Sequence, residues 1–389
     1  MKDTSAGQSD ATIGGVSLEG LRNEFPILDT VAYLNSNSLG ALSKAALAER
    51  HEFERLWNEL GASAWYELWV AKLEEVRAGF GRTIGAGAGE IALMPSVSAA
   101  LTAVAGAVEF AAGRNKVVLT DLDFPTVGHQ FLSRRRLGVE VEIVESPDGI
   151  EVPLEAIQAA VDEHTALVVT SHVYFTTGAI QNAAAVTEIA HDAGALMLLD
   201  AYQSNGQIPI DVESLGVDFL TSGALKWLCG GPGLAFLYVR PNLPLEPTTL
   251  SWFGTERQFE FDIRDSGPRA DARRFEMGTP AVGAAYTAAG GLSIIEEAGI
   301  DRIRDRNRHL AADLVDRLRE AGYKLRLAAN PERQSALVLA RHPDPPDAVR
   351  RLAENGVIVD FRGDCVRFSP HFYNTVEDNA RAVEALSRP

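Results

Sequence analysis

Short apolar runs alternate with helical patterns along residues 45–240, and this alternation restricts the fold more than any other feature of the chain. Two segments between the runs illustrate it: Leu154–Val161 follows Pro153, and Ala183–Ala193 precedes Gly194. Proline and glycine commonly begin and end helices at such positions. Strands that alternate with helices form a mostly parallel sheet covered on both faces. The sequence therefore predicts an α/β domain. Its predicted strands are Val117–Thr120, Val139–Val144, Ala166–Thr170, Ala195–Leu199, Phe219–Thr221 and Leu234–Val239.

The pattern changes after residue 240. Residues 241–282 are rich in proline and read as loop, and Val282–Ala321 has a long helical pattern in which Gly290-Gly291 and Gly299 are expected to be breaks. The remaining segment, Leu325–Leu386, reads as strand, helix, strand, strand, helix, which predicts a smaller α+β domain. The expected division is a disordered tail (1–15), an N-terminal arm that packs with the small domain (16–45), a large domain (46–282) and a small domain (283–389).

The composition argues against several classes of partner. The net charge of −17 is unlike that of a nucleic-acid-binding protein, which carries a basic patch. No apolar run reaches the roughly 20 residues of a membrane span, and the first residues lack the apolar stretch of a signal peptide. The only cysteines are Cys229 and Cys365, too few for a metal cluster or a disulfide framework. A cytoplasmic protein without a metal is expected.

Two charged residues follow consecutive predicted strands. Asp200 ends the apolar run Ala195–Leu199, and Lys226 stands 26 residues later, beyond the run Phe219–Thr221. Ligands of open α/β sheets bind at the carboxyl ends of strands. Pyridoxal phosphate needs an amine for its Schiff base and a carboxylate for its pyridinium nitrogen. A lone lysine would usually be structural, but the pair predicts a site for this cofactor.

Three further features fit such a site, although each also has a structural explanation. Ser96, Val97 and Ser98 precede a helix-forming stretch, so they form either a phosphate-binding helix start or an ordinary N-cap. Phe124 follows a predicted strand, and its ring either stacks on the pyridine or plugs the core. Arg367 alternates with apolar residues and either binds a substrate carboxylate or makes a structural ion pair.

Taken together and in order, these motifs resemble the fold-type I, class V pyridoxal-phosphate enzymes (the aminotransferase class V family), in the branch of kynureninases, isopenicillin-N epimerase-like proteins and cysteine desulfurase relatives. The resemblance extends from about Tyr33 to Leu386. It rests on Tyr33–Gly40, Ser96–Ser98, Asp123–Thr126, Ser171–Val173 with Thr177-Gly178, Asp200–Ser204, Lys226, Ser251–Gly254, Arg274–Pro280 and Arg367–Thr375.

The resemblance implies a role for each matching residue. Lys226 and Asp200 would be catalytic: Lys226 would link to the cofactor and move protons at the substrate α-carbon, and Asp200 would pair with the pyridinium. The implied cofactor contacts are Val97, Ser98 and Trp252 near the phosphate, Phe124 on the ring, Gln203 at the phenolic oxygen, and Thr279 reaching the phosphate of a neighbouring subunit. Thr126 is also expected to bind the cofactor. Thr279 thus implies a homodimer with shared active sites.

The substrate side is implied by the same comparison. Arg367 would hold the α-carboxylate of a small amino-acid substrate, and Asn37 and Ser38 would lie at the mouth of the site. Tyr66, together with Trp65 and Trp69, could line the substrate side, although a packed amphipathic helix is the favoured explanation for Trp69.

Departures from the family pattern narrow the expected reaction. Kynureninases carry a tyrosine immediately before the lysine and a histidine at the position of Gln203. In this chain Leu225 stands before the lysine, and its side chain has no polar group that could donate a hydrogen bond or a proton. Desulfurases carry a reactive cysteine on a loop well before the carboxylate-binding arginine, and a histidine before the lysine. Here Cys365 lies only two residues before Arg367, in a predicted strand, and Cys229 has no evident base partner.

The expected function is therefore β-elimination from a cysteine S-conjugate, as in C–S lyases and natural-product tailoring. Transamination, decarboxylating deamination and epimerisation remain alternatives because they share the same first step at the α-carbon. Kynureninase activity is less expected. A regulator with a vestigial site is the non-enzymatic alternative; the intact set of Lys226, Asp200, Gln203 and Arg367 argues against it.

Overall fold

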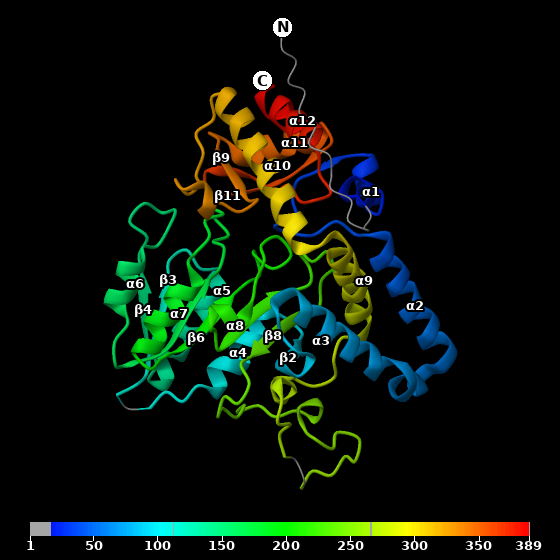
Figure 1. Ribbon diagram of the computed structural model, residues 1–389, viewed down its shortest axis with the longest axis vertical. Coiled ribbons are helices and arrows are strands. Elements are labelled where there is room, and N and C mark those ends of the chain that lie inside the picture. The colour runs from blue at the N-terminus through cyan, green and yellow to red at the C-terminus, as the bar shows by residue number, and fades with distance from the viewer. Residues whose placement is uncertain (1–16, 112, 265–266, 389) are drawn as a thin grey trace.

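The computed structural model describes residues 17–111, 113–264 and 267–388 (Figure 1). Its centre is a seven-stranded sheet with the strand order β2-β8-β7-β6-β5-β3-β4. Neighbouring strands from β7 to β4 are parallel, and β8 runs antiparallel to both β7 and β2. The predicted α/β fold with a mostly parallel sheet is confirmed. The strands are β2 (Ile91–Met94), β3 (Lys116–Thr120), β4 (Glu140–Val144), β5 (Thr165–Ser171), β6 (Leu196–Asp200), β7 (Phe219–Gly223) and β8 (Ala235–Val239).

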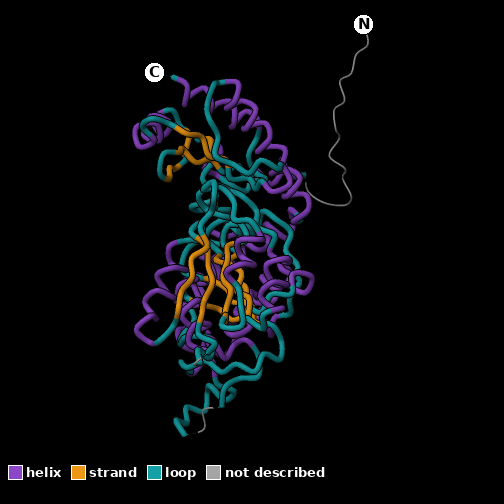
Figure 2. Tube along the Cα trace, turned by 90° about the vertical axis from the view of Figure 1, so that its left-hand side faces the viewer, coloured by secondary structure: helices purple, strands orange, loops and turns teal. Residues whose placement is uncertain are grey.

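Helices cover the sheet on both faces (Figure 2). Successive side chains of one strand enter different cores: Val118 packs in the core that includes α3, α7 and α9, and Val117 packs in the core that includes α4 and α5. Because both faces are buried, the central strands read as continuous apolar runs. The helices of this part are α2 (Lys44–Leu60), α3 (Val70–Ile84), α4 (Val97–Ala107), α5 (Pro125–Leu132), α6 (Leu154–Ala160), α7 (Ala183–Asp192), α8 (Val212–Leu215) and α9 (Val282–Ala298).

A smaller unit lies above the carboxyl ends of the strands in Figure 1. Its antiparallel sheet has the order β11-β12-β9, and the N-terminal strand β1 joins the unit by pairing in parallel with β10. From β9 onward the order is strand, helix, three strands and helix, so the structure has one strand more between the two helices than the sequence predicted. The elements are α1 (Leu18–Arg22), β1 (Ala32–Tyr33), α10 (Ile300–Glu320), β9 (Val338–Arg341), α11 (Pro345–Glu354), β10 (Val357–Ile358), β11 (Asp360–Arg362), β12 (Cys365–Phe368) and α12 (Val376–Ser387).

One of the two expected helix breaks is wrong. Gly299 does separate α9 from α10, with φ at +78°. Gly290 and Gly291 instead lie inside α9, where added β-carbons would come within 2.5 Å of the Ala46 backbone and of the Leu228 carbonyl oxygen. These glycines permit close packing of α9 on α2 and on the turn after Lys226. Their role therefore depends on the segments of the same chain that pack against α9.

The domain boundaries predicted from the sequence remain a prediction. The structure packs α9 mainly against α2 and α3, while α10, α11 and α12 accompany the small sheet. The whole of the proposed tail, residues 1–15, lies outside the described residues. Strand β2 was not among the predicted strands, because its four apolar residues carry no periodicity that separates a strand from a helix.

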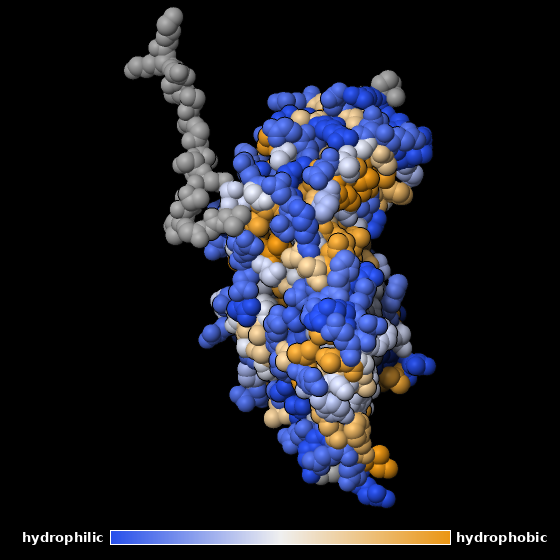
Figure 3. Space-filling model, turned by 90° about the vertical axis from the view of Figure 1, so that its right-hand side faces the viewer, coloured by the Kyte–Doolittle hydropathy of each residue, from blue (hydrophilic) through white to orange (hydrophobic). Residues whose placement is uncertain are grey.

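A loop that the structure describes over residues 255–264 and 267–268 projects from the end of the molecule opposite the small unit (Figure 1). Hydrophobic side chains gather at this projecting end in Figure 3, where Phe261 is 67% and Ile263 is 87% exposed. Across the described ranges, no helix combines the length and the apolarity that crossing a membrane requires.

Candidate active site at Lys226

The sheet brings the predicted catalytic residues to one edge. Asp200 is the last residue of β6 and pairs in register with Ser171 at the end of β5 and with Thr221 of β7. Lys226 follows β7 in a turn in which the Cys229 amide donates to the Lys226 carbonyl oxygen at 3.0 Å. The parallel register thus places the acid and the amine at the carboxyl edge, where α/β sheets bind ligands.

The Lys226 amine lies in an aromatic and largely apolar environment. Its Nζ is 4.3 Å from the centroid of the Tyr202 ring and 5.8 Å from that of Phe124. Burial lowers the pKa of Lys226 to about 8, and the charge of Asp200 opposes this shift. An amine with a depressed pKa is a better nucleophile near neutral pH.

Asp200 is a buried carboxylate without a permanent cation beside it. It is 5% exposed, and among the described residues it accepts one hydrogen bond, from the Tyr202 amide at 2.9 Å. Burial raises its pKa, while the Tyr202 amide and the Lys226 charge act in the opposite direction. A protonated pyridine nitrogen would supply the partner that such a carboxylate needs. The donor set around Asp200 and Lys226 therefore fits pyridoxal phosphate.

Two helix starts face the same edge. Ser96 caps α4 by accepting from the Ala99 amide at 3.2 Å, which leaves the half-buried Val97 and Ser98 in the first turn. Amides in a first turn have no acceptor within the helix and attract anions. Helix α5 begins after Phe124, its N-cap, with Thr126 in its first turn. The assignment of Val97, Ser98, Phe124 and Thr126 to the cofactor remains a prediction.

Both the nitrogen and the oxygen of the Gln203 side-chain amide make hydrogen bonds. Its Nε2 donates to the Asn37 carbonyl oxygen at 3.0 Å, and its Oε1 accepts from the Trp227 indole at 2.9 Å. The residue joins the N-terminal loop to the turn that carries Lys226. A contact between Gln203 and the phenolic oxygen of the cofactor remains a prediction.

Arg367 is 2% exposed and already holds a carboxylate. Its Nε donates to Asp360 Oδ1 at 2.7 Å and its Nη2 donates to Asp360 Oδ2 at 2.6 Å. Nη1 donates to the Phe175 carbonyl oxygen at 2.9 Å, and Nη2 also donates to Ser38 Oγ at 3.1 Å. The buried Asn37 amide satisfies its neighbours when its oxygen faces Arg367, 2.7 Å from Nη2. The structure thus unites Asn37, Ser38 and Arg367, with Asp360 among them.

The described contacts of Trp252, Tyr66 and Thr279 do not join them to the residues around Lys226. Trp252, in the short helix Trp252–Gly254, stacks on Phe261 with 5.9 Å between the ring centroids, and the ring centroids of Tyr66 and Phe259 are 5.3 Å apart. Both therefore pack with residues 255–264 of the projecting loop. Thr279 is exposed, so it is free to meet a neighbouring molecule. The roles given to these three residues remain predictions.

Both cysteines are buried. Burial raises the pKa of Cys229 to about 12, and burial together with Asp364 raises the pKa of Cys365 to about 12. A thiol of this kind is protonated at neutral pH and is a poor nucleophile. The geometry supports the expectation that neither cysteine reacts.

Sequence reasoning missed two residues of the site, Tyr202 and Asp360. Tyr202 stands two residues after Asp200, and this proximity was the available signal. Asp360 has no such signal, because it faces Arg367 only through the pairing of β11 with β12.

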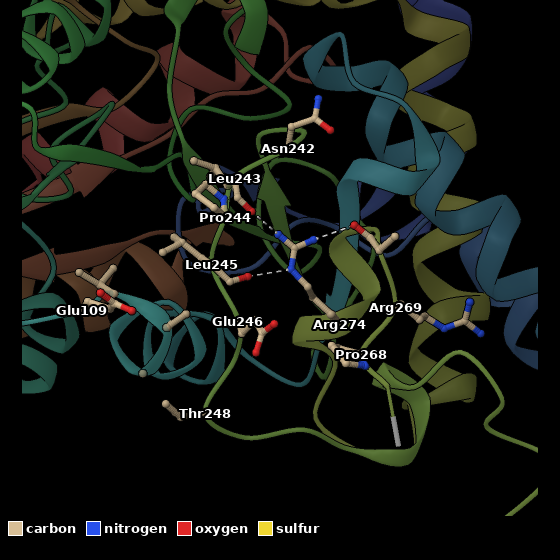
Figure 4. A pocket seen from close by; sticks show the side chains of 14 residues that line it. Glu109, Asn242, Leu243, Pro244, Leu245, Glu246, Thr248, Pro268, Arg269 and Arg274 are labelled. Carbon is tan, nitrogen blue, oxygen red and sulfur yellow. Dashed lines mark hydrogen bonds between the residues drawn. The ribbon is translucent and has the colours of Figure 1, made fainter. Parts of the chain in front are cut away.

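A separate cavity is lined by none of the residues predicted to bind the cofactor or the substrate. It has a volume of about 760 Å³ and lies between the end of α4, residues 242–248 and residues 268–274 (Figure 4). Its most buried charged side chain, Arg274, donates to the backbone carbonyl oxygens of Leu243, Leu245, Ala270 and Asp271. Arg274 thus holds two loops together. Throughout the described part of the chain, no group of three or more histidine, cysteine, aspartate or glutamate side chains is placed to hold a metal ion.

Comparison with known proteins places this geometry in a family. The family model "Aminotransferase class-V" matches residues 32–381. The uncharacterized aminotransferase YcbU of Bacillus subtilis is 37% identical over 371 residues, which cover 95% of this chain and 97% of that protein. A kynureninase of Pseudomonas fluorescens is 30% identical over 397 residues, covering 95% and 92%.

Solved structures show the same fold at lower identity. A cysteine desulfurase from Thermococcus onnurineus superposes with a TM-score of 0.84 at 23% identity and covers 95% of this chain and 97% of that chain. The cystine C–S lyase C-DES superposes with a TM-score of 0.85 at 19% identity, covering 93% and 99%. With Lys226 and Asp200 at the carboxyl edge of the sheet, these matches show that the chain belongs to the aminotransferase class V family of pyridoxal-phosphate enzymes.

Proposed function

We propose that the protein catalyses β-elimination from an S-substituted cysteine, in which the thiol leaves and one water molecule hydrolyses the remaining enamine to pyruvate and ammonia. The observation that carries this proposal is the pairing of an intact Lys226 and Asp200 with two buried, protonated cysteines. Elimination needs a base at the α-carbon and a carboxylate anchor, and it needs no protein thiol. A desulfurase requires a reactive cysteine to take up the sulfur atom, and Cys229 and Cys365 are poorly suited to that step.

The residues of the site divide the work in this reaction. Bound pyridoxal phosphate supplies an electron sink for the pair of electrons left at the α-carbon. Lys226 removes the α-proton, for which its depressed pKa of about 8 suits it. Asp200 keeps a proton on the pyridine nitrogen, since a buried carboxylate favours the charged ring. Arg367 orients the substrate through the α-carboxylate, and the thiolate leaves from the β-carbon.

Kynurenine hydrolysis is disfavoured in this proposal although kynureninases are among the relatives. Leu225 stands immediately before Lys226 and carries no hydroxyl group, so it supplies neither a donor nor a proton there. Tyr202 brings a phenol close to Lys226 by another route. Kynurenine therefore belongs in the substrate panel as a direct comparison.

Transamination is the second candidate, and the 37% identity to a relative named as an aminotransferase favours it. A panel of L-amino acids, L-kynurenine and cysteine S-conjugates separates the candidates when products are identified by mass spectrometry. Elimination yields thiol and pyruvate without a second substrate, whereas transamination requires a 2-oxo acid acceptor. Product formation that depends strictly on a 2-oxo acid would contradict elimination.

We further propose that the enzyme works as a homodimer in which Thr279 of one subunit reaches the phosphate in the other. The exposure of Thr279 and the exposed apolar loop near Trp252 support this arrangement. Analytical ultracentrifugation tests the dimer. A Thr279→Ala variant should bind the cofactor more weakly, and unchanged cofactor binding would contradict the shared site.

A further inference from the structure

Asp360 and Arg367 are fixed opposite each other by the small sheet. The antiparallel register of β11 and β12 makes them direct cross-strand partners. Two nearly parallel hydrogen bonds, at 2.7 and 2.6 Å, join the Nε/Nη2 edge of the guanidinium to the two carboxylate oxygens. A ligand carboxylate would adopt this same side-on geometry on an arginine.

The guanidinium has no second edge to offer. Of its five N–H groups, two bind Asp360, one binds Ser38 and one binds the Phe175 carbonyl oxygen. The remaining N–H belongs to Nη1, which lies 3.3 Å from the Asn37 side-chain oxygen. No pair of N–H groups is therefore left to hold a second carboxylate in a bidentate manner. While Asp360 stays in place, Arg367 therefore cannot anchor a substrate as the family resemblance implies.

Asp360 is nevertheless placed so that it can leave. Strand β11 is the edge strand of its sheet, and the Asp360 side chain is 18% exposed, against 2% for Arg367. The Arg362 guanidinium, 45% exposed, lies 3.6 Å from Asp360 Oδ2. Arg362 can receive the carboxylate of Asp360 once Arg367 is occupied by another anion.

The pair belongs to the active site and not to a remote part of the small unit. Asp360, Arg362 and Arg367 all act electrostatically on the Lys226 amine. Arg367 also binds the carbonyl oxygen of Phe175, whose ring packs edge-on against Phe124 at 5.1 Å. Phe124 in turn lies beside Lys226.

We propose that Asp360 is a specificity-determining residue, which occupies the carboxylate edge of Arg367 in the free enzyme and exchanges with the α-carboxylate of the substrate. The exchange is one for one, because a buried guanidinium left without an anion would be strongly destabilising. Amines that lack the carboxylate leave Asp360 in place and gain nothing from Arg367. This inference rests on the proposed function only in assuming an amino-acid substrate.

Thermal unfolding of the cofactor-free protein tests the exchange with propionate as the probe. Asp360→Asn keeps the shape of the side chain and removes its charge, so the asparagine should hold the guanidinium less tightly. Propionate should then displace it from the Nε/Nη2 edge of Arg367. The propionate concentration for half-maximal stabilisation should fall at least about tenfold relative to wild type, the scale of one charge-assisted hydrogen bond. Chloride at equal ionic strength should not reproduce the effect.

Two further variants keep this test decisive. Asp364→Asn is the matched control: it lies on the same hairpin and pairs with Arg341, both partners being about half exposed (51% and 55%), so its propionate response should equal that of wild type. Ser38→Ala removes a hydroxyl that donates to Asp360 and accepts from Arg367 Nη2, while both hydrogen bonds between Asp360 and Arg367 remain. It should tighten propionate binding about twofold to threefold even if Asp360→Asn folds poorly.

A titration of the cofactor-loaded enzyme completes the test. L-Alanine should change the cofactor spectrum at lower concentration in Asp360→Asn than in wild type, while ethylamine should act equally on both. An unchanged propionate response in both Asp360→Asn and Ser38→Ala would overturn the exchange. If both variants bind propionate more tightly as expected, but the enzyme releases no thiol from any S-conjugate, the proposed function would be contradicted and the exchange would stand.

Discussion

The ring of Tyr202 occupies the space that a side chain at Gly223 would need. A β-carbon built on Gly223 would lie 2.1 Å from Tyr202 Cε2 and 2.7 Å from its hydroxyl oxygen. The same ring lies 4.3 Å from Lys226 Nζ. The absence of a side chain at residue 223 is thus what allows an aromatic ring to stand beside the catalytic amine.

Gly223→Ala should displace Tyr202 and lower kcat/KM by about tenfold, within the range expected for losing a cation–π contact and its packing. Tyr202→Phe keeps the ring and should stay within about threefold of wild type if the contact with Lys226 is what matters. Steady-state kinetics of both variants, with circular dichroism of the bound cofactor, provide the measurement. Wild-type kinetics in Gly223→Ala would show that the position of Tyr202 is immaterial.

Lys226→Ala should abolish turnover and the visible absorption band of the cofactor-loaded enzyme, because Lys226 is the residue proposed to form the Schiff base. The fold should be retained, since Nζ makes no ion pair among the described residues. Absorption spectroscopy and a thermal melt of the purified variant check both expectations. An active alanine variant would refute the assignment of Lys226.

Asp200→Asn should leave the cofactor bound and slow the reaction. The amide cannot hold the proton of the pyridine nitrogen by charge, so the electron sink weakens. We expect a loss of at least about a hundredfold in kcat, the scale of removing one positioned electrostatic group. A rate within about threefold of wild type in a cofactor-saturated sample would contradict this role.

Cys229→Ser and Cys365→Ser should each retain most of the activity, because neither thiol is assigned a chemical step. Burial keeps both thiols protonated at neutral pH. Assays of thiol release should be accompanied by a melt, because Cys229 is packed in a strained turn with φ at +53°. Loss of turnover in a folded, cofactor-loaded serine variant would move the enzyme towards the desulfurases.

Arg367→Lys should weaken binding of amino acids much more than binding of the cofactor. Lysine keeps the charge but loses the two-pronged geometry that holds a carboxylate. The loss should be roughly 1.5–3 kcal/mol, about tenfold to a hundredfold in affinity. Titration with an amino acid and its decarboxylated amine, followed by the cofactor spectrum, measures it. Equal weakening for acid and amine would make Arg367 a structural residue.

Local sequence was sufficient for much of the architecture. The apolar runs that became β3, β5, β6, β7 and β8 were visible because strands buried on both faces require continuous apolar residues. The positions of Asp200 and Lys226 at neighbouring strand ends followed from the same runs. Family motifs then supplied roles that periodicity alone does not carry.

Contacts between distant segments were decided by the tertiary structure. Gly290 and Gly291 looked like helix breaks until the packing of α2 and of the turn at Leu228 showed why the helix needs them. Asp360 acquired its meaning from the register of β11 and β12, and the Tyr202–Gly223 contact from the adjacency of β6 and β7. The sequence by itself determined the class of fold and the pair Asp200 and Lys226, because these depend on local pattern and strand ends. Only the folded chain decided that Arg367 is already occupied, because that depends on which side chains the sheets bring face to face.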